Sequence, residues 1–141
     1  MAELEERVYQ RVLELSEEGK ALEAANDLAA AKGKFLEALK LVPQPHQNWS
    51  ASTWLYANLG DTHFKLQSFE KCFMCFLNAV QCPGGLGNPF IHLRLGQMYF
   101  EQGNFEKAAD ELTRAYMGGG LEVLLEDDPK YLAFLETKID V

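Results

Sequence analysis

The sequence predicts an all-α protein in which pairs of helices stack on one another. Apolar residues recur three and four positions apart over most of the chain, which is the period of an amphipathic helix. Strand signals are weak, because β-branched residues are few and no alternation with a period of two persists. The third observation is an internal repeat, in which small and bulky residues stand at fixed offsets from glycines.

The repeat is anchored at three glycines, Gly19, Gly60 and Gly96. Twelve residues after each glycine stands a small residue, sixteen after it a bulky one, and nineteen after it an alanine. The small residues are Ala31, Cys72 and Ala108, the bulky ones Phe35, Phe76 and Leu112, and the alanines Ala38, Ala79 and Ala115. Small side chains let two helix backbones approach, and the bulky ones fill the space that remains. A single helix pair cannot bury both of its faces, so neighbouring pairs must stack.

The offsets of the repeat predict where the helices and turns lie along the chain. An acidic first helix begins near Ala2 and extends the first repeat. We place the three repeats at 12–45, 53–86 and 89–120, with tight turns at 26–28, 67–69 and 103–105 inside them. In the junction CPGGLGNPF, Asn88 is expected to cap a helix whose first residue is Pro89. A carboxy-terminal capping segment, 121–141, contains a short apolar helix and a final helix from about Pro129.

This pattern resembles the tetratricopeptide repeat, whose form is W-x2-L-G-x2-Y, then A-x3-F, then P. The third repeat, HLRLGQMYFEQGNFEKAADELTRAY, is a close match. The second has Tyr56 in the tryptophan slot and His63 in the tyrosine slot, and the first has Glu18 where leucine is expected. The resemblance covers residues 12–120 and implies a superhelix of three antiparallel helix pairs with terminal caps. The stretches TWLYANLGD, CPGGLGNPFIHLRLGQ and DDPKYLAFL also resemble small bacterial repeat proteins encoded beside secreted toxins.

Composition and charge limit the classes of function that the chain could have. A chain of 141 residues suits a single domain, 1–141, and no apolar run is long enough to span a membrane. The start, MAELEERVYQ, lacks the apolar core of a signal peptide, and three cysteines are expected to be reduced thiols, so a cytoplasmic location is expected. The net charge is −8, with −5 in residues 1–27 and −4 in residues 122–141. Acidic ends argue against nucleic-acid binding, which requires a basic surface. They suit a basic protein partner, and the alternative is that they serve solubility alone.

Chemical sites are weakly indicated. A zinc site could be drawn from Cys72, Cys75 and Cys82 with His63 or His92. The simpler interpretation is that the cysteines are buried thiols and that His63 is packed with its hydrogen bonds satisfied. The glycines of the junction could cradle a phosphate, but no Gly-Lys-Ser/Thr follows them. The pair Asp127–Asp128 is interpreted as helix N-caps. We therefore predict no cofactor, no metal site and no catalytic activity.

The resemblance implies a concave groove lined by the first helix of each pair. The residues that it places there as partner-binding candidates are Lys20, Glu23, Trp54, Asn58, Asp61, Phe64, Lys65, Phe90, Arg94, Gln97, Phe100 and Glu101. The alternative for the aromatic members is that the terminal helices cover some of them. Some members of the family clamp the carboxylate end of chaperone tails, but only Asn58 and Arg94 match that clamp. Its lysine slots hold Ser16 and Phe90, and its first asparagine slot holds Lys20.

We therefore predict non-catalytic protein binding. The most concrete version is a bacterial immunity protein that binds and neutralises a cognate toxin. The alternative is a scaffold or assembly chaperone that recruits a peptide segment of a partner. A third hypothesis is an unrecognised enzyme or metal protein.

Overall fold

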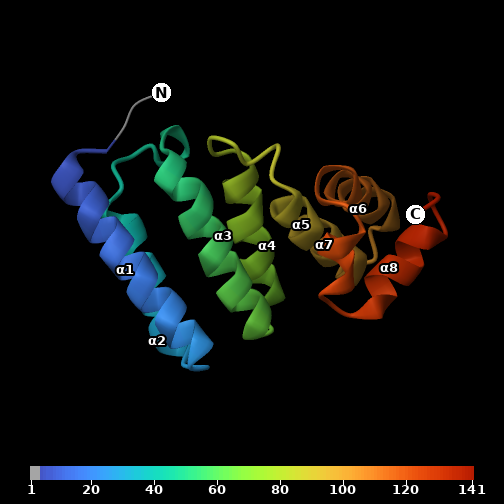
Figure 1. The fold of residues 1–141 in the computed structure, drawn as a ribbon, viewed down its shortest axis with the longest axis horizontal. Helices are drawn as coiled ribbons and strands as arrows, with labels where there is room; N and C mark the ends of the chain where they lie inside the picture. Colours follow the sequence, from blue (N-terminus) through green and yellow to red (C-terminus); the bar gives the residue numbers. More distant parts are fainter. Residues whose placement is uncertain (1–3) are drawn as a thin grey trace. The chain divides into compact units, whose positions relative to one another are not determined.

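A computed structural model describes residues 4–141, and these residues form eight α-helices and one 3-10 helix (Figure 1). Consecutive helices pack as pairs, as the sequence predicts. The pairs are α1 (Glu6–Ala24) with α2 (Leu28–Leu41), α3 (Ser50–Lys65) with α4 (Phe69–Val80), and α5 (Pro89–Glu101) with α6 (Phe105–Gly119). The 3-10 helix η1 (His46–Asn48) precedes α3, and the short helices α7 (Leu121–Leu125) and α8 (Pro129–Glu136) follow the last pair. The predicted all-α fold of helix pairs is thus confirmed.

The chain divides into two compact units. The amino-terminal unit extends to Gly84 and holds the first two helix pairs, and the carboxy-terminal unit spans Gly85–Val141 and holds the third pair with α7 and α8. No helix among the described residues is both long and apolar enough to cross a membrane.

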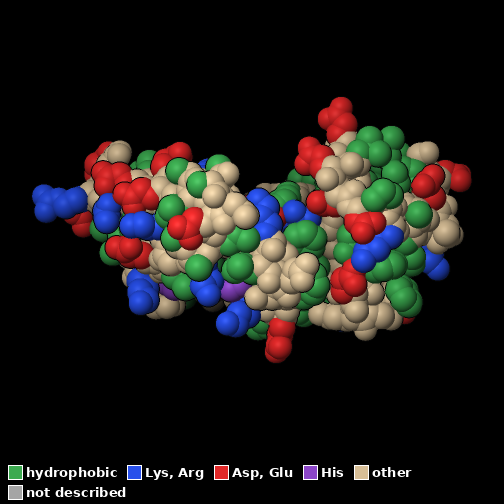
Figure 2. Space-filling view, turned by 90° about the horizontal axis from the view of Figure 1, so that it is seen from below, with side chains coloured by type: hydrophobic (Ala, Val, Ile, Leu, Met, Phe, Trp, Pro, Cys, Tyr) green, Lys and Arg blue, Asp and Glu red, His purple; other side chains and the backbone are tan. Residues whose placement is uncertain are grey.

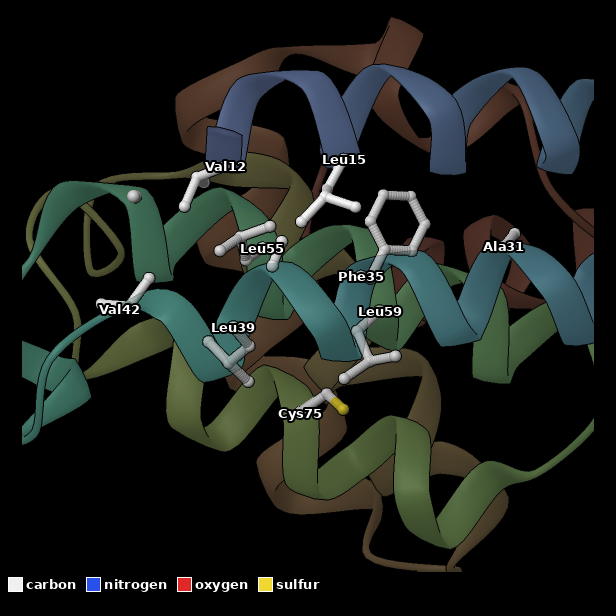
Figure 3. Close-up of a cluster of buried hydrophobic side chains, with 11 residues drawn as sticks. Val12, Leu15, Ala31, Phe35, Leu39, Val42, Leu55, Leu59 and Cys75 are labelled. Atoms are coloured by element: carbon white, nitrogen blue, oxygen red, sulfur yellow. The ribbon is translucent and has the colours of Figure 1, made fainter. Parts of the chain in front are cut away.

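The core of the amino-terminal unit is built from the apolar stripes of its helices. Leu15 of α1 and Phe35 of α2 point into the space between these two helices, and both are fully buried (Figure 3). Leu55 and Leu59 of α3 join the same cluster. The carboxy-terminal unit has its own core, which contains Leu93, Leu112, Ala115, Leu124, Tyr131 and Leu135.

The three anchor glycines have equivalent surroundings, as the repeat predicts. A Cβ added to Gly19 would stand 2.7 Å from the Phe35 ring, and one added to Gly60 would stand 2.6 Å from the Phe76 ring. At Gly96 the nearest atom would be Cγ of Leu112, at 2.7 Å. In each pair, the glycine of the first helix therefore lies directly against the bulky residue of the second helix, sixteen positions later.

The three predicted turns within the pairs share one backbone geometry. Asn26, Gln67 and Gly103 all adopt positive φ angles, of 63°, 60° and 79°. In each turn the next amide bonds to a carbonyl in the last turn of the preceding helix, for example Ser68 N to His63 O at 2.9 Å. This is the Schellman arrangement, which satisfies carbonyls that the helix end would leave without a partner.

The junction and the two ends follow most of the sequence expectations. Asn88 caps α5, because its side chain accepts a hydrogen bond from the Phe90 amide at 2.9 Å, and Pro89 is the first helical residue. The last helix begins at Pro129 as predicted. The predicted start near Ala2 lies outside the described residues, and within them α1 begins at Glu6.

Candidate functional site

The amino-terminal unit brings together three of its predicted site residues. The Lys65 ammonium of α3 binds Glu23 of α1, and it lies 3.5 Å from the Asp61 carboxylate. Thr62 also donates a hydrogen bond to Glu23, at 3.3 Å. The two contacts to Glu23 join residues about forty positions apart and bring the carboxy-terminal ends of α1 and α3 together. We call the surface formed by Lys20, Glu23, Trp54, Asn58, Asp61, Phe64 and Lys65 the α1–α3 face.

The electrostatics of this face are those of a paired cluster. Burial alone lowers the pKa of Lys65, but the hydrogen bond to Glu23 and the nearby Asp61 charge outweigh it, so the pKa is raised. Lys65 is therefore a cation at neutral pH. Lys20 is exposed and adds a second positive charge. On the side of the molecule seen in Figure 2, basic and acidic side chains are interspersed over this unit, at the left of the view.

The aromatic residues of the α1–α3 face are half-buried. Trp54 packs against the core cluster of the unit, and Phe64 contacts the Phe69 ring with centroids 5.8 Å apart. Asn58 is also half-buried, and its backbone carbonyl accepts a hydrogen bond from Thr62 at 3.0 Å. The face thus offers the exposed parts of two rings between charged groups of both signs.

In the carboxy-terminal unit, two predicted residues form a buried polar cluster with an acid from the capping segment. The Arg94 guanidinium donates to the Gln97 side-chain oxygen at 2.7 Å and to Oδ2 of Asp127 at 2.8 Å. The Gln97 amide donates to the same Oδ2 at 3.0 Å. Gln97 is fully buried, and only 8% of the Arg94 side chain is exposed. Arg94 also lies over the Phe90 ring, 4.9 Å from its centroid, which adds a cation–π contact within the unit.

Helix α8 contacts two more of the predicted residues of this unit. The Phe100 ring makes edge contacts with Tyr131 and Phe134, at centroid distances of 5.4 and 5.2 Å. Glu101 accepts hydrogen bonds from the Tyr131 hydroxyl at 2.7 Å and from the Lys130 ammonium at 2.8 Å. These two bonds, led by that from Lys130, lower the pKa of Glu101. For Phe100, therefore, the alternative that a terminal helix covers the ring is the one observed.

Asp127 is the residue that the sequence interpretation missed. Only Asp128 acts as a cap, accepting from the Lys130 amide at 3.0 Å, so the interpretation of both acids as N-caps was wrong for Asp127. One signal was available in the sequence. A proline at the first helical position makes its immediate predecessor the N-cap, which leaves Asp127 without that role.

The two histidines considered as metal ligands have structural surroundings. His92 is buried, and its ring nitrogens contact the Glu111 carboxylate and the Leu86 carbonyl, each at 2.5 Å. His63 is also buried, but its Nδ1 has no hydrogen-bond partner among the described residues, so the expectation of a fully satisfied ring was wrong. Burial, and secondarily the charges of Lys32 and Lys71, lower the pKa of His63.

The three cysteines are buried thiols, as predicted. Burial raises the pKa of Cys75 to about 11 and also raises that of Cys82, so neither is an activated nucleophile. Within residues 4–141, no three His, Cys, Asp or Glu side chains are grouped so that they could hold a metal ion.

Comparison with known proteins identifies the architecture. No family model and no curated protein sequence matches the chain. Solved structures do match, among them the Hsp90 co-chaperone Cns1 from Saccharomyces cerevisiae, with a TM-score of 0.70 and 18% identity over 94% of this chain. The fold is TPR-like. The chain spans 39% of the length of the Cns1 chain.

Two further structures share this TPR-like fold. The amino-terminal domain of stress-induced protein-1 (STI-1) from C. elegans matches with a TM-score of 0.67 and 16% identity, over 94% of this chain and 98% of that domain. MamA matches with a TM-score of 0.60 and 17% identity, over 91% of this chain and 80% of its own. At these identities the matches establish the fold alone, and any partner must be inferred from the surfaces described above.

Proposed function

We propose that the chain is a non-catalytic protein-binding module that recruits a peptide segment of a partner on the α1–α3 face. The observation that carries this proposal is the bond network from Glu23 to Lys65 and Thr62, which joins the first helices of two successive pairs into one surface. First helices line the binding groove in the family that the sequence resembles. The TPR-like fold supports the same placement.

The chemistry of the face indicates the kind of segment that would bind. The half-buried rings of Trp54 and Phe64 offer apolar contact area that is already ordered, so little side-chain entropy is lost on binding. Lys20 supplies an exposed cation, whereas Lys65 is already paired with Glu23 and Asp61. A short peptide with one apolar anchor and an acidic flank fits such a surface.

This chemistry differs from the clamp for chaperone tails. Ser16, in one of the required lysine slots, is 2% exposed, and Arg94 is occupied by Asp127. We therefore propose recruitment of a different peptide class.

Between the two predicted forms of binding, we favour peptide recruitment over toxin neutralisation. One of the similar structures is named as an Hsp90 co-chaperone, and none of the three is named as an immunity protein. The immunity hypothesis is supported by the acidic ends of the chain and remains a prediction.

Site-specific photo-crosslinking in a lysate of the source organism tests the proposal. A benzoylphenylalanine replaces Phe64 on the α1–α3 face in one variant, and Leu36 on α2 in a matched control, because Leu36 is 40% exposed and belongs to a second helix. We expect one partner to crosslink from position 64 and not from position 36. A partner that crosslinks equally from both positions, or from position 36 alone, would refute binding on this face.

A further inference from the structure

The capping segment contacts four of the five predicted site residues of the carboxy-terminal unit. Asp127 binds Arg94 and Gln97, and α8 contacts Phe100 and Glu101. In the α1–α3 face, by contrast, the ion pairs of Lys65 are made with residues of α1 and α3. The surface of α5 that the repeat pattern assigns to partner binding is thus occupied by another part of the same chain.

The contacts made by this segment are those of a peptide ligand. A carboxylate accepts hydrogen bonds from a guanidinium and an amide, and two aromatic rings then pack on an aromatic side chain of α5. The contacting residues Asp127, Tyr131 and Phe134 are spaced by four and then three positions. Because Tyr131 and Phe134 are separated by one helical turn, both rings lie on the same side of α8.

Asp127 is the more exposed partner of the Arg94–Asp127 pair. The Asp127 side chain is 21% exposed, whereas that of Arg94 is 8% exposed, so an external carboxylate can reach the guanidinium only if Asp127 leaves. The segment joins α6 through Gly120, whose φ of 75° marks the point where helical direction changes. Rotation about this glycine would move α7 and α8 without unwinding α6, and it would expose Leu124, Tyr131 and Leu135, which belong to the core of this unit.

We propose that residues 121–136 act as an internal ligand, which a partner segment of the same chemistry displaces. That partner would present an acidic residue followed by aromatic residues four and seven positions later on a helix. The inference rests on the proposed protein-binding function, to which it adds a second, regulated surface. Because the internal ligand is tethered, its local concentration is high, and the free chain stays closed until a partner with matching contacts competes.

The first test is hydrogen exchange on the wild-type chain. If the segment detaches as a unit, the amides of α8 exchange at least about tenfold faster than those of α5 and α6. Exchange of all three helices at one common rate would show that α8 is a fixed part of the unit and would overturn the proposal.

The second test supplies the segment in trans. A fluorescent peptide with the sequence of residues 121–136 is titrated into the full-length chain and into its Asp127→Asn variant, in which the internal contact is weakened. We expect the variant to bind the peptide about tenfold more tightly or better, since a hydrogen-bonded charge is worth at least one such factor. A peptide in which Asp127 is itself replaced by Asn should not show this tighter binding to the variant chain.

The matched control is Asp128→Asn in the chain. It removes the same charge one residue away and keeps an N-capping side chain, but it does not touch Arg94. Equal peptide affinity of the Asp127→Asn and Asp128→Asn chains would refute the internal-ligand role. Neither test involves position 64, so failure here leaves the crosslinking result intact, and failure of the crosslinking leaves these two measurements interpretable.

Discussion

The close contact at Gly60 allows a quantitative test of the repeat. Ala is favoured over Gly in a helix interior by about 1 kcal/mol, so Gly→Ala should stabilise a helix wherever space is available. Gly33 in α2 is such a position, because an added Cβ would meet nothing within 4 Å. Gly33→Ala should therefore raise the free energy of unfolding by about 0.5–1 kcal/mol.

Gly60→Ala should have the opposite sign. The new Cβ would stand 2.6 and 2.8 Å from two Phe76 ring atoms and 3.1 Å from Cβ of Cys75, whereas carbon atoms normally approach to about 3.5–4.0 Å. Phe76 is fully buried and cannot swing aside. Overpacking of this kind costs about 1–3 kcal/mol, which offsets the gain in helix propensity and leaves a net loss of up to about 2 kcal/mol.

Urea unfolding followed by circular dichroism measures both variants. The two should differ in free energy of unfolding by about 1–3 kcal/mol, which is the cost of the contact alone. Combining Gly60→Ala with Phe76→Leu should recover part of the loss, because the smaller side chain leaves room for the methyl group. If Gly60→Ala is as stabilising as Gly33→Ala, then the glycine does not serve close approach of the two helices, and the physical account of the repeat fails.

Three further outcomes follow from the same structure. Gln67→Gly should stabilise the chain by about 0.5–1 kcal/mol in urea titrations, because Gln67 has a φ of 60°, which glycine adopts without strain; a loss of stability would contradict the turn geometry. Burial lowers the pKa of His63, so the unfolded chain binds this proton more readily, and stability should fall as the pH drops through about 6.5. His63→Phe should reduce that slope in urea midpoints measured between pH 5 and pH 8 (about the range in which histidine titrates), and an unchanged slope would count against the assignment. Cys75 should react with a thiol reagent at neutral pH only as fast as the chain unfolds, because burial raises its pKa to about 11; rapid reaction in the native state would show an accessible thiolate.

The features that could be predicted from the sequence are local ones. Helix pairs, turns and the Asn88 cap depend on residues within one or two turns of each other, so periodicity and glycine spacing are enough to find them. Each anchor glycine contacts a bulky residue sixteen positions later, which is farther along the chain. These contacts could still be predicted, because the same offset occurs three times in the sequence.

Contacts outside the repeat could not be predicted in this way. Glu23 meets Lys65 forty-two positions later, and Arg94 meets Asp127 thirty-three positions later, across segments whose path depends on loop geometry. Opposite charges are common on any surface, so nothing in the sequence singles out these pairs. That Nδ1 of His63 lacks a hydrogen-bond partner could not be predicted either. The residues around this atom belong to other helices, and the repeat spacing gives the positions of those helices only approximately.

A comparison of equivalent repeat positions explains why the capping segment carries an acid at position 127. Asn58 and Arg94 occupy the same slot of the repeat, thirty-six residues apart, as do Phe64 and Phe100. A neutral Asn58 can be half-buried at little electrostatic cost, whereas a guanidinium buried to the extent of Arg94 requires a counter-charge and hydrogen-bond acceptors. Asp127 and Gln97 supply both. Arginine in place of asparagine at this slot of the repeat therefore requires a carboxylate partner, and the chain's own capping segment supplies one.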